Sequence, residues 1–315
     1  MILMSKAFSR VFKKTSKLEK GEGGWTICPP PLIMTYKYEH MLVDSKNCIY
    51  RAIHAGLADP NFTKTKADFA VVYFRFLSAY INKFRPRSIH FFWDVPKEEV
   101  WRRDLFKEYK DGRVSEVEEH LKRTSEIIHG LIPFLNSREY IRERQEADDL
   151  IYAFCKLNPK KKIIIISSDG DFKQISHYNL DIDLYNPLAR EIRIYDRSKD
   201  IDPVEEKCLT GDTSDNLDGY DQIGEVRARQ VVADFKYRKE LFKKQGSDLY
   251  DLNRKLIDLS LCPFISKNMI YVADKLSEDV QFSYPQLVST IQKYKVKGLM
   301  SEMSKTILSF KFLEK

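Results

Sequence analysis

The sequence predicts an α/β fold in which helices cover both faces of a mostly parallel central sheet, followed by a helical C-terminal part. Between Met41 and about residue 200, short apolar runs alternate with longer segments of helical periodicity. Ile163–Ile166 is a run of four isoleucines, which is typical of a strand buried on both faces. From Pro203 onward the periodicity is mainly helical.

The elements follow a strand–helix order that favours parallel pairing. The expected strands, in chain order, are the runs at 41–44, 88–94, 163–166, 180–186 and 191–196. A turn at Pro187 and Leu188 is expected to join the last two strands. The expected helices are a segment ending at Ala55, the aromatic-rich segment 66–84, parts of 97–136, and 146–157.

Three parts are expected along the chain. They are a basic tail and linker at 1–40, an α/β domain at 41–200 and a helical region at 201–315. The tail carries five basic residues before Glu19. It fits a targeting segment, an arm that touches a phosphate backbone, or a tail with no specific role, and these alternatives stay open.

Composition narrows the function classes. The 315 residues are 43% hydrophobic and 31% charged, and no apolar run is long enough to cross a bilayer. A net charge of +7 favours an anionic partner such as nucleic acid. The five cysteines form no CxxC pair, so a disulfide scaffold or structural zinc is not expected and a reducing cytoplasm fits best.

Acidic residues follow three of the expected strands. Asp44 ends the first, Asp94 ends the second, and Asp169 and Asp171 follow the isoleucine run. Any one of them would serve as a helix cap or turn residue. Because parallel strands end at the same edge of a sheet, the four side chains are expected to lie close together.

Two further segments add carboxylates. QEADDL places Glu146, Asp148 and Asp149 at a helix start, where the helix dipole alone also favours acids. LTGDTSDN contributes Asp212 and Asp215. Nine converging carboxylates would repel one another without cations. An oxygen-only ligand set favours Mg²⁺ or Mn²⁺, and two such ions suit in-line attack on a phosphodiester.

The motif order VD, WD, E-x-D-D, SSDGD and GD-x-x-DN resembles the structure-specific 5′-nuclease (flap endonuclease) family. The likeness is greatest to the bacteriophage 5′-exonuclease and ribonuclease H type, and it runs from Met41 to Phe235. It implies a PIN-like sheet, a helical arch at about 97–136 and a helix–three-turn–helix that grips duplex DNA.

The resemblance also implies two metal sites. One would be held by Asp94, Glu146, Asp148 and Asp169. The other would be held by Asp171, Asp212 and Asp215, with Asp169 a candidate for both. Asp44 and Asp149 would lie beside them and act through water.

WRRDLFKEYKDGR at 101–113 is a basic run, which is usually a solvated helix face. By the resemblance, Lys110 and Arg113 contact the scissile phosphate as catalytic residues beside Asp94 and Asp169. Tyr109 would stack on a base. The expected DNA contacts of this run are Arg102, Arg103, Tyr109, Lys110 and Arg113.

GDTSDNLDGYDQIGEVRARQVV matches the helix–three-turn–helix in outline. Gly219 and Gly224 would let the backbone approach phosphates, and Arg227 and Arg229 would face DNA. The aliphatic residues expected to pack the second helix are Ile223, Val226, Val231 and Val232. Tyr220 replaces the aliphatic residue and Gln222 replaces the middle glycine of the family's G-V-x-G-I-G. Binding of K⁺ by the carbonyl groups of this turn therefore depends on whether they keep the family's arrangement.

The leading hypothesis is a Mg²⁺-dependent 5′-3′ exonuclease and flap endonuclease that acts in DNA replication and repair. It would cleave near the 5′ ends of branched or nicked DNA and RNA/DNA duplexes. It is expected to be a monomer and to act in the cytoplasm, which would be that of the host cell if the protein is phage-encoded. One alternative is a non-catalytic DNA-junction binder, although every motif acid is present. Another is a PIN-like ribonuclease, which would not need the arch or GD-x-x-DN.

The C-terminal run TILSFKFLEK carries an apolar stripe. It is expected either to pack on the body of the protein or to dock a sliding clamp or single-strand DNA-binding protein, with packing preferred.

Overall fold

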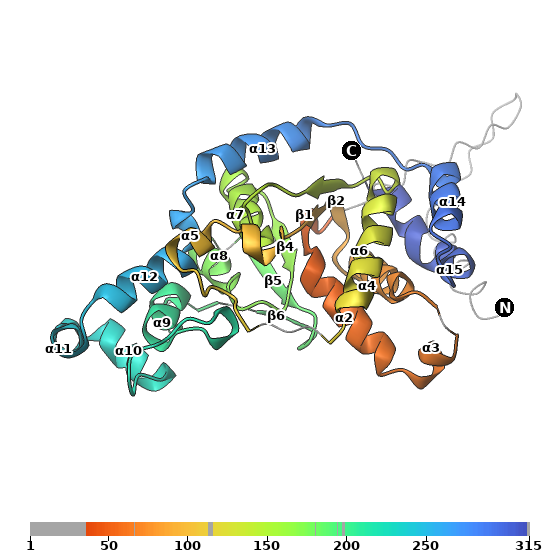
Figure 1. The fold of residues 1–315 in the computed structure, drawn as a ribbon. Coiled ribbons are helices and arrows are strands. Elements are labelled where there is room, and N and C mark those ends of the chain that lie inside the picture. The colour runs from red at the N-terminus through yellow and green to blue at the C-terminus, as the bar shows by residue number, and fades with distance from the viewer. Residues whose placement is uncertain are drawn as a thin grey trace, which may run out of the picture. The chain divides into compact units, whose positions relative to one another are not determined.

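The computed structural model describes residues 36–65, 67–112, 116–179, 181–193, 195–196 and 199–313 (Figure 1). Residues 36–315 form one compact unit. The basic tail and Arg113 therefore lie outside the described residues. No helix in the described part of the chain is long and apolar enough to span a bilayer.

The central sheet has six strands in the order β3-β2-β1-β4-β5-β6. The strands are β1 (Tyr38–Asp44), β2 (Pro86–Phe92), β3 (Arg138–Tyr140), β4 (Ile163–Ile166), β5 (Ile182–Asn186) and β6 (Glu191–Arg193). Pairing is parallel from β3 to β5, and β6 pairs antiparallel with β5. The predicted strands and the mostly parallel sheet are confirmed. The sequence-based prediction missed β3, which has three residues and no apolar run.

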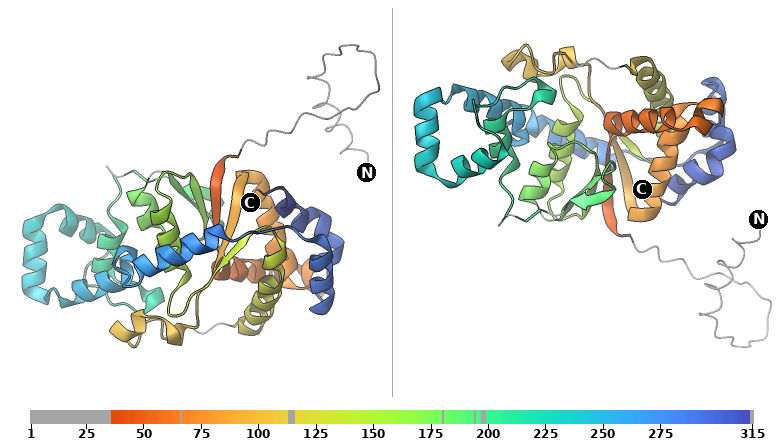
Figure 2. Two further views of the ribbon diagram at one scale, coloured as in Figure 1. Left: turned by 90° about the horizontal axis from the view of Figure 1, so that it is seen from above. Right: turned by 90° about the horizontal axis from the view of Figure 1, so that it is seen from below.

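Each face of the sheet is covered by its own group of helices (Figure 2). On one side lie α2 (Ser45–Leu57), α4 (Phe69–Phe84), α6 (Glu118–Leu131), α14 (Tyr284–Lys293) and α15 (Leu299–Thr306), with α3 (Pro60–Thr65) beside α2. On the other lie α7 (Ala147–Leu157), α8 (Lys173–Tyr178) and α13 (Ile265–Ser277). Ile164 and Ile166 face the first group, and Ile163 and Ile165 face the second. Alternating side chains of one strand thus fill both cores, as its apolar run predicts.

Residues 97–136 are helical only in part. They contain the 3₁₀ turn η1 (Lys97–Glu99), the short α5 (Arg102–Leu105), turns up to residue 112, and then α6. Leu121, Ile127 and Ile128 of α6 are buried in the core beside α2 and α4. The segment available for the predicted arch is therefore limited to residues before α6.

A third cluster of buried residues lies under the helices that follow the sheet. Its helices are α9 (Pro203–Thr210), α10 (Glu225–Ala233), α11 (Phe235–Gln245) and α12 (Asp248–Ile257). Tyr220 is buried here, and its hydroxyl donates to the Gly246 carbonyl at 2.8 Å. Ile223 and Val231 are buried as predicted, but the packing prediction for Val226 is wrong, because its side chain is 73% exposed.

The C-terminal stripe packs on the body of the protein. In η5 (Ile307–Phe312), Ile307 and Phe310 are fully buried, and Leu313 beyond it is 6% exposed. Phe310 contacts Phe74 of α4 edge to face. The packing alternative is therefore confirmed, and these apolar side chains are not available to dock another protein.

Phe310→Ala is expected to lower the free energy of unfolding by about 3–5 kcal/mol, because it removes a buried ring and leaves a cavity. Phe312→Ala is the matched control, since Phe312 is 58% exposed. It should change stability by no more than about 0.5 kcal/mol. Urea titration followed by circular dichroism measures both; equal effects would contradict the packing described here.

Candidate active site

Three acids lie at one edge of the sheet because neighbouring parallel strands end there. Asp44 ends β1, Asp94 follows β2 and Asp169 follows β4, and β1 lies between the other two strands. The Asp44 carboxylate caps α2 by accepting from Asn47 N–H at 3.3 Å, and it also accepts from Ser167 Oγ at 2.8 Å. Capping and clustering therefore coexist.

The acids at this edge lie close enough to change one another's pKa values. Burial, then the charges of Asp94 and Asp169, raise the pKa of Asp44 to about 7. Burial, then the charge of Asp171, raise the pKa of Asp169 to about 6. Neighbouring carboxyl groups with such raised pKa values are typical of functional sites.

The SSDGD turn holds its acids through local hydrogen bonds. Ser167 Oγ accepts from Asp169 N–H at 3.0 Å while it donates to Asp44. The Asp169 carboxylate accepts from Asp171 N–H at 2.9 Å. Ser168 donates to Asn47 Oδ1. The two serines thus tie the turn after β4 to the start of α2, a role that the sequence did not reveal.

The start of α7 supplies the next acids. Glu146 is the N-cap, and its carboxylate and that of Asp149 form a reciprocal capping box. These two acids therefore stabilise the start of α7, as acids at a helix N-terminus are expected to do. Burial, then the neighbouring carboxylates against the opposing charge of Arg102, raise the pKa of Asp148 well above its usual value.

Arg102 lies inside this acidic group with a side chain that is 1% exposed. Its guanidinium donates to Glu146 at 2.8 Å, to both oxygens of Asp149 at 3.1 and 3.0 Å, and to the Leu256 carbonyl of α12 at 2.8 Å. Trp101 Nε1 donates to Asp149 at 3.0 Å. All five hydrogen bonds are buried, so the ion pairs are strong and geometrically fixed.

This geometry corrects three expectations. Arg102 is too buried to contact DNA, and its charge instead compensates Glu146 and Asp149. Tyr109 is 2% exposed, and its hydroxyl donates to Glu146 and Asp215, so the ring is not placed to stack on a base. Both oxygens of Asp149 are bonded to Arg102, so Asp149 supports the guanidinium rather than facing an open site.

Lys110 enters the cluster from the turn after α5. Its Nζ is 2.5 Å from Glu146 and 3.9 Å from Asp215, and its N–H donates to the Asp215 carbonyl at 3.0 Å. Burial alone would raise the pKa of Glu146, but Lys110 and Arg102 lower it to about 2. Glu146 is therefore ionised at neutral pH. Arg103 instead pairs with Asp111 at 2.7 Å and remains partly exposed.

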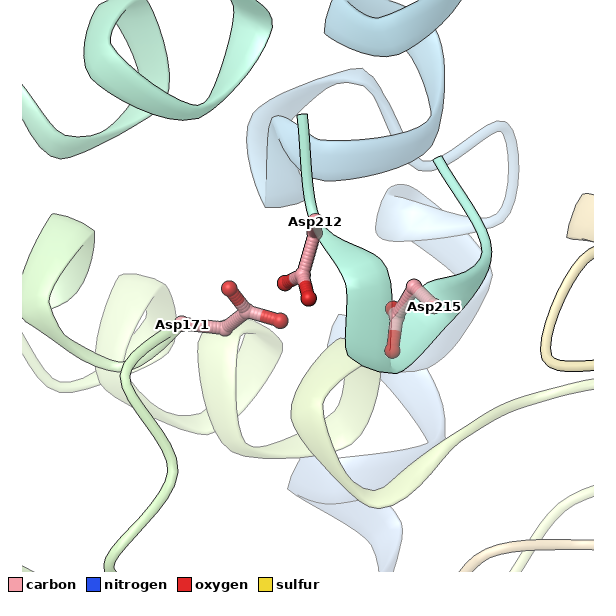
Figure 3. A group of neighbouring side chains, drawn as sticks. All are labelled: Asp171, Asp212 and Asp215. Atoms are coloured by element: carbon pink, nitrogen blue, oxygen red, sulfur yellow. The ribbon is translucent and has the colours of Figure 1, made fainter. Parts of the chain in front are cut away.

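The GD-x-x-DN segment brings a second group of acids together. It folds into η3 (Thr213–Asp215), and one oxygen each from Asp171, Asp212 and Asp215 lies within 4.8 Å of the others (Figure 3). Asp212 also caps η3 by accepting from Ser214 N–H at 2.9 Å. A Cβ on Gly219 would lie 2.2 Å from the Thr210 carbonyl oxygen, so this glycine serves close packing of the turn.

Lys207, on the last turn of α9, was not predicted as a site residue. Its Nζ forms ion pairs with both Asp171 and Asp212. Burial lowers the pKa of Lys207, but the two carboxylates outweigh it, so the pKa lies above its ordinary value. No pattern in the sequence distinguishes this lysine from the many others.

The start of α10 is open to solvent. A Cβ placed on Gly224 would meet no atom within 4 Å, and Arg227 and Arg229 are exposed. Arg227 donates to the carbonyl of Gln222 at 2.8 Å, and Gln222 has a left-handed φ of 60°. The turn thus keeps a conformation suited to glycine although glutamine occupies it.

Removing the buried cation tests its structural role. Arg102→Met is expected to destabilise the protein by about 3–5 kcal/mol, because it leaves Glu146 and Asp149 buried without their partner. Arg103→Met is the matched neighbour and should cost less than about 1 kcal/mol, since its ion pair is partly solvated. Denaturant unfolding compares the two, and a similar small effect from both would contradict a fixed internal ion pair.

Comparison with known proteins shows which family this chain matches. Residues 39–208 match the family described as the 5′-3′ exonuclease, N-terminal resolvase-like domain. A 5′-3′ exonuclease of Mycoplasmopsis pulmonis is 24% identical over 291 residues, which cover 87% of this chain and 96% of that protein. The flap endonuclease Xni of Shewanella frigidimarina is 27% identical and covers 64% of this chain and 79% of its own length.

Solved structures share the fold. The D15 protein of bacteriophage T5, co-crystallised with metal ions, matches with a TM-score of 0.58 at 19% identity, over 81% of this chain and 98% of that chain. The same phage flap endonuclease, in a product complex with DNA and metal ions, matches with a TM-score of 0.57. Because the family match spans more than half of its 315 residues, the chain belongs to the 5′-3′ exonuclease family.

Proposed function

We propose that this protein is a divalent-metal-dependent nuclease, a 5′-3′ exonuclease and flap endonuclease that acts on branched or nicked DNA and RNA/DNA duplexes. One observation carries the proposal: acids from five separate chain segments converge at the carboxyl edge of the sheet beside Lys110. The printed functions of the relatives, and the DNA and metal ions bound by the phage protein, support the same chemistry.

We propose that these acids bind two divalent cations. Within the described residues, only Asp171, Asp212 and Asp215 bring their oxygens within 4.8 Å of one another, so the assignment of the other ion follows the sequence motifs. The donors are carboxylate oxygens without sulfur or imidazole, which favours Mg²⁺, with Mn²⁺ able to substitute. We assign one ion to Asp94, Glu146, Asp148 and Asp169, with Asp44 beside them. We assign the second to Asp171, Asp212 and Asp215. K⁺ at the helix–three-turn–helix stays a prediction, since Arg227 already bonds the Gln222 carbonyl.

When bound, the metal ions would supply an activated water and neutralise charge on the phosphate. The chain's own residues hold the site in place: Arg102 fixes Glu146, and Ser167 fixes Asp44. Lys110 is 17% exposed and lies beside Glu146 and Asp215, so its ammonium is within the site and still accessible. We propose that it contacts the scissile phosphate, with Arg113 of the same motif beside it.

The duplex would be held by α10 and the turn before it. Gly224 leaves the helix start open, and backbone N–H groups at a helix N-terminus favour phosphate. Exposed Arg227 and Arg229 add positive charge on the same helix. A junction binder without catalysis would not need the full set of acids, and their close approach disfavours that alternative.

The first experiment uses a 5′-flap duplex labelled separately at each end, with and without Mg²⁺. Metal-dependent release of 5′-terminal products is expected, and Asp169→Asn should lower the rate at least about 10²-fold because a proposed ligand of the first ion is lost. Asp274→Asn, an exposed acid on α13, is the control and should keep full activity. Tight flap binding without cleavage under any divalent metal would refute the nuclease and favour the junction binder.

A second test concerns the phosphate contact. Lys110→Ala is expected to lower the single-turnover cleavage rate about 10²–10³-fold with little change in flap affinity, because the lost charge acts mainly on the transition state. Lys107→Ala removes an exposed lysine of the same segment and should leave the rate nearly unchanged. If both variants cleave like the unmodified protein, Lys110 is not a catalytic residue.

A further inference from the structure

Lys207 lies between two acids that come from different parts of the chain. Asp171 follows β4, and Asp212 begins the turn after α9. The ammonium forms ion pairs with both, and the three side chains are 25%, 18% and 13% exposed. The position is therefore partly enclosed but can be reached by solvent.

The helix beneath this lysine is firmly placed. Asp202 caps α9 by accepting from Val204 N–H at 2.9 Å, and Cys208 and Leu209 are fully buried. The backbone of Lys207 is thus fixed, whereas its four-carbon side chain has several rotatable bonds. A fixed base with a flexible charged arm allows the ammonium to leave without any change in the fold.

The ammonium occupies the place where a cation is needed most. Asp171, Asp212 and Asp215 offer oxygens within 4.8 Å of one another, and these oxygens repel unless a positive charge compensates them. Arg102 contacts the acids at the start of α7, and Lys110 contacts Glu146 there at 2.5 Å and Asp215 only at 3.9 Å. Lys207 is the charge that faces Asp171 and Asp212.

We propose that Lys207 is the resident counter-cation of the Asp171–Asp212–Asp215 site, and that a divalent ion enters this site only by displacing its ammonium. The proposal rests on the assignment of a second metal under the proposed function. Because the incoming ion must replace an existing ion pair, its affinity is lower than three carboxylates alone would give. Lys207 therefore determines the occupancy of the second site at a given metal concentration.

Metal binding without DNA tests this directly. Titration with Mn²⁺, followed by the electron paramagnetic resonance signal of the free ion, gives the dissociation constants of both sites. Lys207→Met should tighten the weaker site by about tenfold or more and leave the tighter site within about twofold. Lys207→Arg keeps the positive charge and should keep the weak affinity.

Lys173→Met is the matched control. Lys173 is a partly buried lysine of α8, close to Gly170 in the same acidic turn, and within the described residues Asp171 forms its ion pair with Lys207 instead. Its substitution should change neither Mn²⁺ site by more than about twofold. The metal-free Lys207→Met protein should also melt at a lower temperature than the unmodified protein. Saturating Mn²⁺ should remove this difference in melting temperature.

Each other outcome overturns the proposal. Unchanged or weaker Mn²⁺ binding in Lys207→Met would show that the lysine does not compete with the ion. Tightening by Lys173→Met as well would show a general charge effect. Absence of any second Mn²⁺ in the unmodified protein would remove the site itself. Failure of the nuclease proposal is separate, since it appears as an uncleaved flap in a protein that still binds two ions.

Discussion

Like charge concentrated at one edge of the sheet is the constraint on which the rest of this structure depends. Parallel pairing of β2, β1 and β4 brings Asp44, Asp94 and Asp169 together, and burial, followed by the charges of the other two acids, raises the pKa of Asp44. Such a group is tolerated in a folded protein only when positive charge lies among it. Three largely buried cations, Arg102 of α5, Lys110 of the turn after it and Lys207 of α9, pair with the acids that adjoin this edge.

The same ion pairs connect the parts of the chain. Arg102 joins the start of α7 to the Leu256 carbonyl of α12, and Lys110 joins the turn after α5 to η3 through the Asp215 carbonyl. The helices that follow the sheet are thereby attached to it at the acidic site itself. The positions of the acids are therefore coupled to the positions of the helices that would hold DNA. Substitution of Arg102 is expected to shift both.

The sequence predicted what depends on neighbouring residues and local periodicity. The isoleucine run and the acids that follow the strands are local patterns, so their placement at one edge was foreseeable. Arg102, Tyr109 and Lys207 were not, because their partners are remote: Arg102 and Leu256 are 154 residues apart. From the sequence alone, a basic run such as WRRD looks like a solvated helix face. The carboxylates that pair with Arg102 inside the protein are distant in the sequence, so the run itself gives no sign of them. Val226 was assigned to the core because aliphatic character alone does not give the face of a helix.

The three cations differ in how readily they can leave their partners. The side chain of Arg102 is 1% exposed and makes several buried bonds, that of Lys110 is 17% exposed, and that of Lys207 is 25% exposed. A guanidinium held by two carboxylates and a carbonyl cannot be withdrawn without unpairing them all. A solvent-accessible ammonium can exchange its partners for water or a phosphate. The most buried cation therefore stabilises the site, and the two more exposed ammonium groups are the ones that can leave their carboxylates to a metal ion or contact a phosphate.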